Sequence, residues 1–132
     1  MTDRFKLRYN YNNKIYDVSA IDFTRSRGEI VSLDKKETLM CKLDLNNLIQ
    51  CTGLKDKNSK LIYEGDIIKY MYYNPERYTK WVVVFNQNTL EFGLKDYGYD
   101  GYSRLTSYSI INNKVEVIGN IYENPELLKE NE

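Results

Sequence analysis

The sequence predicts a mainly β fold, built as one strongly bent sheet or as a partly open small barrel, with a short helix at its C-terminal end. Three observations predict it. Apolar and polar residues alternate along several short segments, which is the two-residue period of a strand with one solvated face. β-branched and aromatic residues dominate residues 67–73 and 81–85, as they do in strands. Clusters of Asn, Asp, Ser and Gly separate these segments and favour turns.

The first fifty residues contain a series of short predicted strands. Apolar side chains alternate with Lys6 and Arg8 over residues 5–9, and the polar residues 10–14 supply a turn to a returning strand, which forms a hairpin. An amphipathic helix over residues 34–43 remains an alternative to the strand predicted there. The expected strands are residues 5–9, 15–18 with a possible extension to 23, 29–33, 38–45 and 48–51.

The densest set of turn signals lies in residues 52–70. The loop 55–60 is rich in side chains that bond their own backbone, and a short strand, a tight corner at Gly65 and a long strand follow it. Glycine at the corner can adopt a positive φ that other residues resist. Four residues are assigned structural roles in these turns: Gly53, Asp56, Gly65 and Asp66.

The second half continues the β pattern. Residues 81–85 are apolar on both faces and predict a buried strand, which pairs through a turn at 86–89 with a strand in which Leu90, Phe92 and Leu94 point inward. Residues 96–103 predict a loop, and residues 105–111 are ambiguous between strand and helical turn. The remaining expectations are a last strand over residues 115–122 with a bulge at Gly119, and a helix that Asn124 caps and Pro125 begins.

Two runs in this chain carry a family resemblance. QCTGLKDKNSKLIYEGDIIKY (residues 50–70) and VEVIGNIYENPELL (residues 115–128) resemble the two signature blocks of the YopX family of phage and prophage proteins. The resemblance implies a small, mainly β protein encoded by bacterial viruses or their integrated remnants, with residues 1–132 as a single domain. It supplies no catalytic residue. In its barrel form, the expected fold resembles SH3-like folds.

Length and charge set further limits. A chain of 132 residues fits one domain with a real core. Its 19 basic and 19 acidic residues balance, which argues against strong non-specific binding to a phosphate backbone. The ends differ in sign, with six Lys/Arg against three Asp/Glu in residues 1–27 and one against five in residues 115–132. This asymmetry either brings ends or subunits together or reflects solvated faces.

The compartment follows from what the sequence lacks. Cys41 and Cys51 have no spacing or partner residues typical of a zinc site and are expected to be reduced, half-buried apolar residues. No secretory signal and no apolar run of about 18 residues is present, so no membrane association is expected. We expect the protein in the cytoplasm of a bacterial host cell.

The residue types needed for common enzyme chemistry are mostly missing. There is no histidine, which removes the usual general base and the commonest zinc ligand, and no phosphate-binding glycine motif occurs. Glu64 and Asp66 flank Gly65, and in a strand they would share one side, where they could bind a hard cation or share a proton. The favoured alternative is that Asp66 braces the corner while Glu64 faces solvent. We therefore expect no enzyme, cofactor or metal, and keep a carboxylate-dependent enzyme as the second alternative.

Aromatic and basic residues interleave in two stretches, which gives the functional hypothesis. Such side chains are enriched at protein interfaces, stack on nucleic-acid bases, or simply cover sheet faces. We expect a non-catalytic accessory protein that binds a phage or host protein or a second copy of itself, and the alternative is a β-barrel nucleic-acid-binding protein. The candidate contact residues are Tyr70, Tyr72, Tyr73, Arg77, Tyr78, Tyr97, Tyr99, Tyr102 and Arg104.

Overall fold

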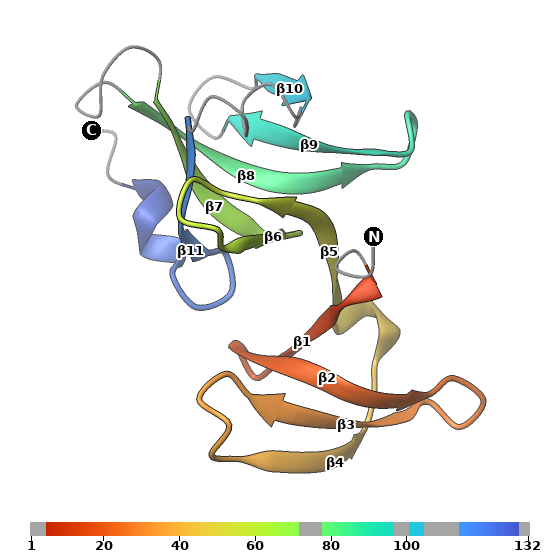
Figure 1. Ribbon diagram of the computed structural model, residues 1–132. Coiled ribbons are helices and arrows are strands. Elements are labelled where there is room, and N and C mark those ends of the chain that lie inside the picture. Colours follow the sequence, from red (N-terminus) through yellow and green to blue (C-terminus); the bar gives the residue numbers. More distant parts are fainter. Residues whose placement is uncertain (1–4, 72–77, 97–100, 105–113, 130–132) are drawn as a thin grey trace.

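The computed structural model describes residues 5–71, 78–96, 101–104 and 114–129, which form a mainly β protein (Figure 1). Its strands make two antiparallel sheets, in the orders β4-β3-β2-β1-β5-β6 and β10-β9-β8-β7-β11. The ambiguous segment 105–111 lies outside the described residues. The strands are β1 (Leu7–Tyr11), β2 (Lys14–Asp22), β3 (Arg27–Ser32), β4 (Thr38–Lys42), β5 (Leu48–Lys55), β6 (Leu61–Tyr63), β7 (Asp66–Met71), β8 (Tyr78–Asn86), β9 (Glu91–Asp96), β10 (Tyr102–Arg104) and β11 (Val115–Asn120).

The mainly β prediction is confirmed, but the strands are divided between two sheets rather than one, and within the described ranges neither sheet closes into a barrel. Strand β5 belongs to the six-stranded sheet but links two lobes of the molecule, one built around β1–β4 and the other around β7–β11 (Figure 1). Its first half pairs with β1 and its second half with β6, so it runs from the β1–β4 lobe into the β7–β11 lobe (Figure 1). Gly53, with φ 82°, lies where the β5–β6 register shifts, so it sits in a bulge within a strand.

The first hairpin has strands of unequal length. Tyr11 pairs with Lys14 across a tight turn in which Asn12 and Asn13 have φ of 52° and 64°, values that asparagine tolerates better than most residues. Pairing with β1 extends along β2 only as far as Asp17, although β2 continues to its ninth residue. Among the described residues, the remaining part of β2 therefore has a neighbouring strand, β3, on one side only.

Three apolar clusters form the core of the part of the chain that the structure describes. One fills the β7–β11 lobe around Ile68 and Val83, and a second fills the β1–β4 lobe around Ile30. A third lies between them and combines Ile15 of β2 with Cys51 of β5, together with residues of β6 and the turn after β11. This third cluster packs residues of both lobes together.

The strand expected over residues 38–45 is present as β4, which ends at Lys42, and the alternative helix over residues 34–43 is ruled out because Lys35 adopts φ 65°. Other local expectations need correction. Leu90 is 76% exposed with φ 57°, so it belongs to the turn and does not point inward. The predicted loop 96–103 includes the start of β10, which pairs with β9.

The C-terminal helix is present as the short 3₁₀ helix η3 (Pro125–Lys129), and another, η2 (Leu45–Asn47), precedes β5. Side-chain Oδ1 of Asn124 accepts a hydrogen bond from the Asn120 backbone N–H. The described ranges contain no α-helix. Among those residues, no helix is both long enough and apolar enough to span a bilayer.

Candidate functional site

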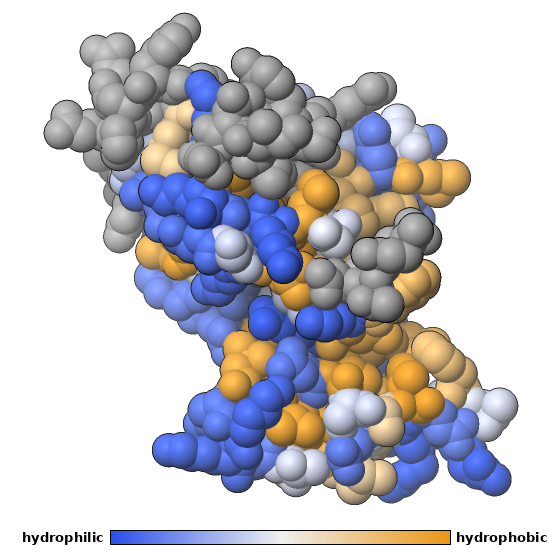
Figure 2. Space-filling model, in the orientation of Figure 1, coloured by the Kyte–Doolittle hydropathy of each residue, from blue (hydrophilic) through white to orange (hydrophobic). Residues whose placement is uncertain are grey.

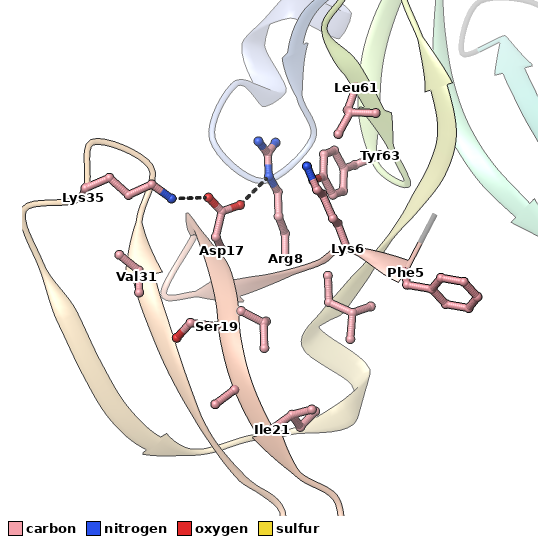
Figure 3. Close-up of a pocket in the computed structure, with 13 residues that line it drawn as sticks. Phe5, Lys6, Arg8, Asp17, Ser19, Ile21, Val31, Lys35, Leu61 and Tyr63 are labelled. Atoms are coloured by element: carbon pink, nitrogen blue, oxygen red, sulfur yellow. Dashed lines mark hydrogen bonds and ion pairs between the residues drawn. The ribbon is translucent and has the colours of Figure 1, made fainter. Parts of the chain in front are cut away.

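A groove of about 630 Å³ lies where β1 and β2 diverge (Figure 3). The two strands are in register at Arg8 and Asp17, and beyond this pair the chain before β1 turns away while β2 continues beside β3. Residues 5–8 line one side of the groove and residues 17–21 line the other, with Leu61 and Tyr63 of β6 above. Its volume is in the range of pockets that hold ligands.

A row of charged side chains crosses the upper end of the groove (Figure 3). Asp17 accepts from both sides, with Oδ1 at 3.2 Å from Arg8 Nε and Oδ2 at 3.1 Å from Lys35 Nζ. The Arg8 guanidinium also lies over the Tyr63 ring, with Cζ at 4.0 Å from the ring centroid. This contact and the Asp17 bond fix the orientation of the guanidinium. Lys6 also lines the groove. Arg8 and Lys35 share the one carboxylate of Asp17, so positive charges outnumber negative ones in this row.

Below the charged row most of the lining side chains are apolar, and the exposed Ser19 lies among them (Figure 3). Val18 and Ile21 are half-buried and pack against the core cluster of the β1–β4 lobe, and Val31 of β3 lines the groove nearer to Lys35 (Figure 3). Phe5, on the opposite wall, is 70% exposed. Hydrophobic and hydrophilic side chains alternate over the β1–β4 lobe on the face in Figure 2. The groove therefore combines an apolar floor with a cationic rim.

A corner at residues 63–66 lies beside the groove and joins the two lobes. Gly65 has φ 88°, and a Cβ at this position would lie 2.7 Å from Tyr122 Cε2, so only glycine fits. Asp66 is 6% exposed, and its Oδ2 accepts the Tyr63 backbone N–H at 2.8 Å. Burial raises the pKa of Asp66 to about 7, against the lowering effects of the Tyr63 N–H and of nearby Arg8.

Glu64 is half-buried, and burial raises the pKa of its carboxyl. The expectation that it faces solvent is therefore not met in full. Both carboxylates line a cavity of about 10 Å³, the size of a single water site. Arg8 reaches this cavity as well as the groove. Within the described ranges, no three carboxylates or cysteines come together as a metal site.

The loop before β6 is organised by Asp56. Oδ1 of Asp56 accepts the backbone N–H groups of Asn58 at 2.8 Å and Lys60 at 2.9 Å, and Oδ2 accepts that of Val117 in β11 at 2.9 Å. The carboxylate is 6% exposed. One side chain thus closes a loop and ties it to a strand about sixty residues away in the sequence.

The predicted contact residues fall in different environments. Tyr70 is half-buried and packs against the core of the β7–β11 lobe. Tyr78 is 42% exposed, with Lys69 Nζ at 4.3 Å from its ring centroid, and Tyr102 is 45% exposed. Arg104 ends β10. Tyr72, Tyr73, Arg77, Tyr97 and Tyr99 lie outside the described residues.

The structure does not bring the two exposed tyrosines together. Tyr102 pairs with Lys95 of β9, and Lys95 pairs with Val82 of β8. Tyr78 is the first residue of β8, four residues before Val82. The two tyrosines are therefore separated by roughly 13 Å along the strand direction, at about 3.3 Å per residue. The Tyr102 ring also occupies the space above Gly93, where a Cβ would meet its hydroxyl. Tyr102 therefore packs on a glycine of the neighbouring strand as well as facing solvent.

Sequence reasoning missed the groove residues Arg8, Asp17 and Lys35. The one signal available was the hairpin itself, because the pattern allowed its second strand to extend further than its first. Unequal strands leave part of the longer one without a neighbour on one side. Charged residues near the end of the shorter strand, such as Arg8 and Asp17, are therefore the sequence signal for this site.

Comparisons with known proteins agree with this architecture. The chain is similar to protein EF1440 from Enterococcus faecalis, whose crystal structure superposes with a TM-score of 0.58 at 26% sequence identity. The match covers 93% of this chain and 96% of the other. No curated protein matches this sequence significantly. The family model described as YopX protein matches residues 5–129, so nearly the whole chain is covered, and the protein belongs to the YopX family.

Proposed function

We propose that this protein is a non-catalytic phage or prophage accessory protein that acts in the cytoplasm of its bacterial host by binding another protein. The observation that supports the proposal best is the groove between β1 and β2, with its apolar floor, cationic rim and volume of about 630 Å³. Apolar anchors surrounded by polar and charged groups are typical of protein-binding sites. The oriented guanidinium of Arg8 over Tyr63 is the kind of residue on which interface energy concentrates.

The tyrosine-bearing strands are a second contact surface in this proposal. Tyr78 is exposed beside Lys69, and Tyr102 is exposed on β10, so both present rings to a partner. The finer fold belongs to the same proposal. We regard β5 to β11 as a partly open SH3-like barrel, which is supported by one core cluster that includes Leu54 of β5, Ile62 of β6 and Val115 of β11.

The proposal gives Glu64 and Asp66 a structural role. One carboxylate oxygen of Asp66 accepts the backbone N–H of Tyr63 in the same corner. Glu64 lies beside a cavity that has room for no more than one water. A substrate would need far more space than this cavity offers. The proposal therefore includes no reaction.

Site-specific photo-crosslinking in host cells tests the function. A benzophenone amino acid would replace Ala20, which is exposed in the groove wall, and in a control protein it would replace Asn88, which is exposed in the β8–β9 turn. We expect protein adducts from position 20 that survive nuclease treatment and are absent from position 88. Equal adducts from both positions, or adducts that disappear with nuclease, would contradict the proposal.

A further inference from the structure

The groove contains an unpaired strand edge. Strand β2 pairs with β3 as far as Asp22, but with β1 only as far as Asp17. Within the described ranges, residues 18–22 of β2 have no strand on the β1 side, and no backbone hydrogen bond between described residues outside the sheet pairings reaches them. Ser19 and Ala20 in this segment are exposed. A row of backbone groups therefore faces the groove.

Such an edge is a template for another strand. An extended peptide can add to a sheet edge through main-chain hydrogen bonds, while pockets beside the edge select its side chains. Five residues of β2 correspond to roughly 17 Å of strand at about 3.3 Å per residue. The groove extends along this edge, since residues 17–21 all line it. An added strand would thus have both backbone partners and space.

The lining of the groove indicates the chemistry of that strand. Its apolar lining, which includes Val18, Ile21 and Val31, suits apolar side chains. Arg8 and Lys35 share the single carboxylate of Asp17, so the rim retains positive charge after its own ion pairs are made. Acidic side chains or a C-terminal carboxylate complement this charge, and guanidinium recognises carboxylate with two parallel hydrogen bonds.

We propose that residues 18–22 of β2, together with the adjoining groove, bind an extended acidic and apolar segment of a partner protein by strand addition. The inference rests on the protein-binding function proposed above and adds the class of partner segment and its mode of binding. A nucleic acid fits this site less well, because it cannot continue the main-chain ladder and would meet the Asp17 carboxylate within the cationic row.

A random twelve-residue peptide library displayed on phage tests the proposal on the full chain. The purified wild-type protein would be used for selection, and the enriched peptides would be synthesised and titrated by fluorescence anisotropy. We expect enrichment of Asp and Glu together with alternating Val, Ile, Leu or aromatic residues. In an added strand, every second backbone N–H of the peptide faces β2. N-methylation of that set of nitrogens should weaken binding about tenfold, because it removes the N–H groups that hydrogen-bond to β2, whereas methylation of the other set should not.

Charge variants locate the binding site. Lys35→Glu reverses a charge on a side chain that is 68% exposed and should weaken the selected peptides about tenfold. The matched control is Lys57→Glu, another lysine in an ion pair, which lies in the loop before β6 and should leave affinity unchanged. Raising the salt concentration should weaken wild-type binding, because the charges at the rim are partly exposed.

Three results would overturn the inference. They are a selection that yields no peptide above background, peptides without acidic residues, and peptides that bind the Lys35→Glu protein as well as the wild type. These outcomes are independent of the crosslinking result. Protein adducts at position 20 without acidic peptides would support the proposed function and reject strand addition. Acidic peptides without adducts in cells would reject the proposed function and support strand addition as the way this edge binds peptides.

Discussion

Replacing Asp66 by Asn tests the energetic role of the corner that joins the two lobes. The carboxyl is 6% exposed, and burial raises its pKa to about 7 from an ordinary value of 3.8. Between these two values the unfolded chain has lost the proton while the folded chain retains it. The folded state then binds more protons, so the stability contributed by protonated Asp66 is lost as the pH rises toward and through 7.

The expected size follows from this difference in proton binding. A full proton corresponds to about 1.36 kcal/mol for each pH unit, so from pH 5 to pH 7 the wild-type protein should lose up to about 3 kcal/mol through this group. Asn keeps the oxygen that accepts the Tyr63 N–H and carries no charge. The Asp66→Asn protein should therefore become more stable relative to wild type by about this amount across the interval.

Urea unfolding followed by tyrosine fluorescence and circular dichroism at pH 5, 6, 7 and 8 gives the free energies of unfolding. The control is Asp34→Asn, because hydrogen bonds from the Ser32 hydroxyl and the Lys36 N–H lower the pKa of that exposed carboxyl. The Asp34 carboxyl is ionised in both the folded and the unfolded protein over this range. The effect of Asp34→Asn on the free energy of unfolding should therefore not change with pH. If the wild-type and Asp66→Asn stabilities stay parallel from pH 5 to pH 8, the account of the corner is wrong.

Three shorter predictions concern the same scaffold. Gly65→Ala should lower the free energy of unfolding by about 2 kcal/mol or more, because φ is 88° and the added methyl would press on Tyr122; thermal unfolding measures it, and an unchanged midpoint would refute the steric argument. Asp56→Asn should lower the free energy of unfolding by about 1–3 kcal/mol, because an amide has one acceptor oxygen and leaves the Val117 N–H or the loop N–H groups unpaired. Hydrogen exchange measures it: the amide of residue 117 should lose its protection in the variant, and full protection would contradict the account. Native maleimide labelling should modify only half-buried Cys41 at an appreciable rate, and mass spectrometry showing two rapid additions would contradict the burial of the other thiol.

The parts of the fold that depend on local chemistry could be predicted from the sequence. The first turn follows from consecutive asparagines, the corner at Gly65 from a residue that tolerates positive φ, and the break in β11 from Gly119, where the β7–β11 register does shift. Strand periodicity located most strands within a few residues. It failed at Leu90, because the alternation of apolar residues continues into a turn whose backbone points the side chain outward.

The candidate site depended on pairings that no local pattern contains. The groove exists because β1 takes β5 as its second neighbour, through pairs such as Leu7 with Gln50, and is shorter than β2. Aromatic composition was also a poor guide to exposure. Tyr70 contributes to the core and Tyr102 covers a glycine, while the aromatic ring that orients the groove guanidinium, Tyr63, is buried. A tyrosine in a strand indicates a half-polar surface, but its neighbours decide which role it has.

Arg8 lies beside both the groove and Asp66, so a variant of Arg8 cannot test peptide binding in the groove separately from stability. Its guanidinium lines the groove and also lies close enough to Asp66 to lower the pKa of that carboxyl. Arg8→Gln should therefore raise the pKa of Asp66 further and change stability with pH, in addition to any loss of binding. The Lys35 ammonium bonds Asp17, and Lys35 does not line the cavity beside Asp66. Loss of peptide binding in a Lys35 variant of unchanged stability can thus be assigned to the groove, whereas the same loss in an Arg8 variant cannot.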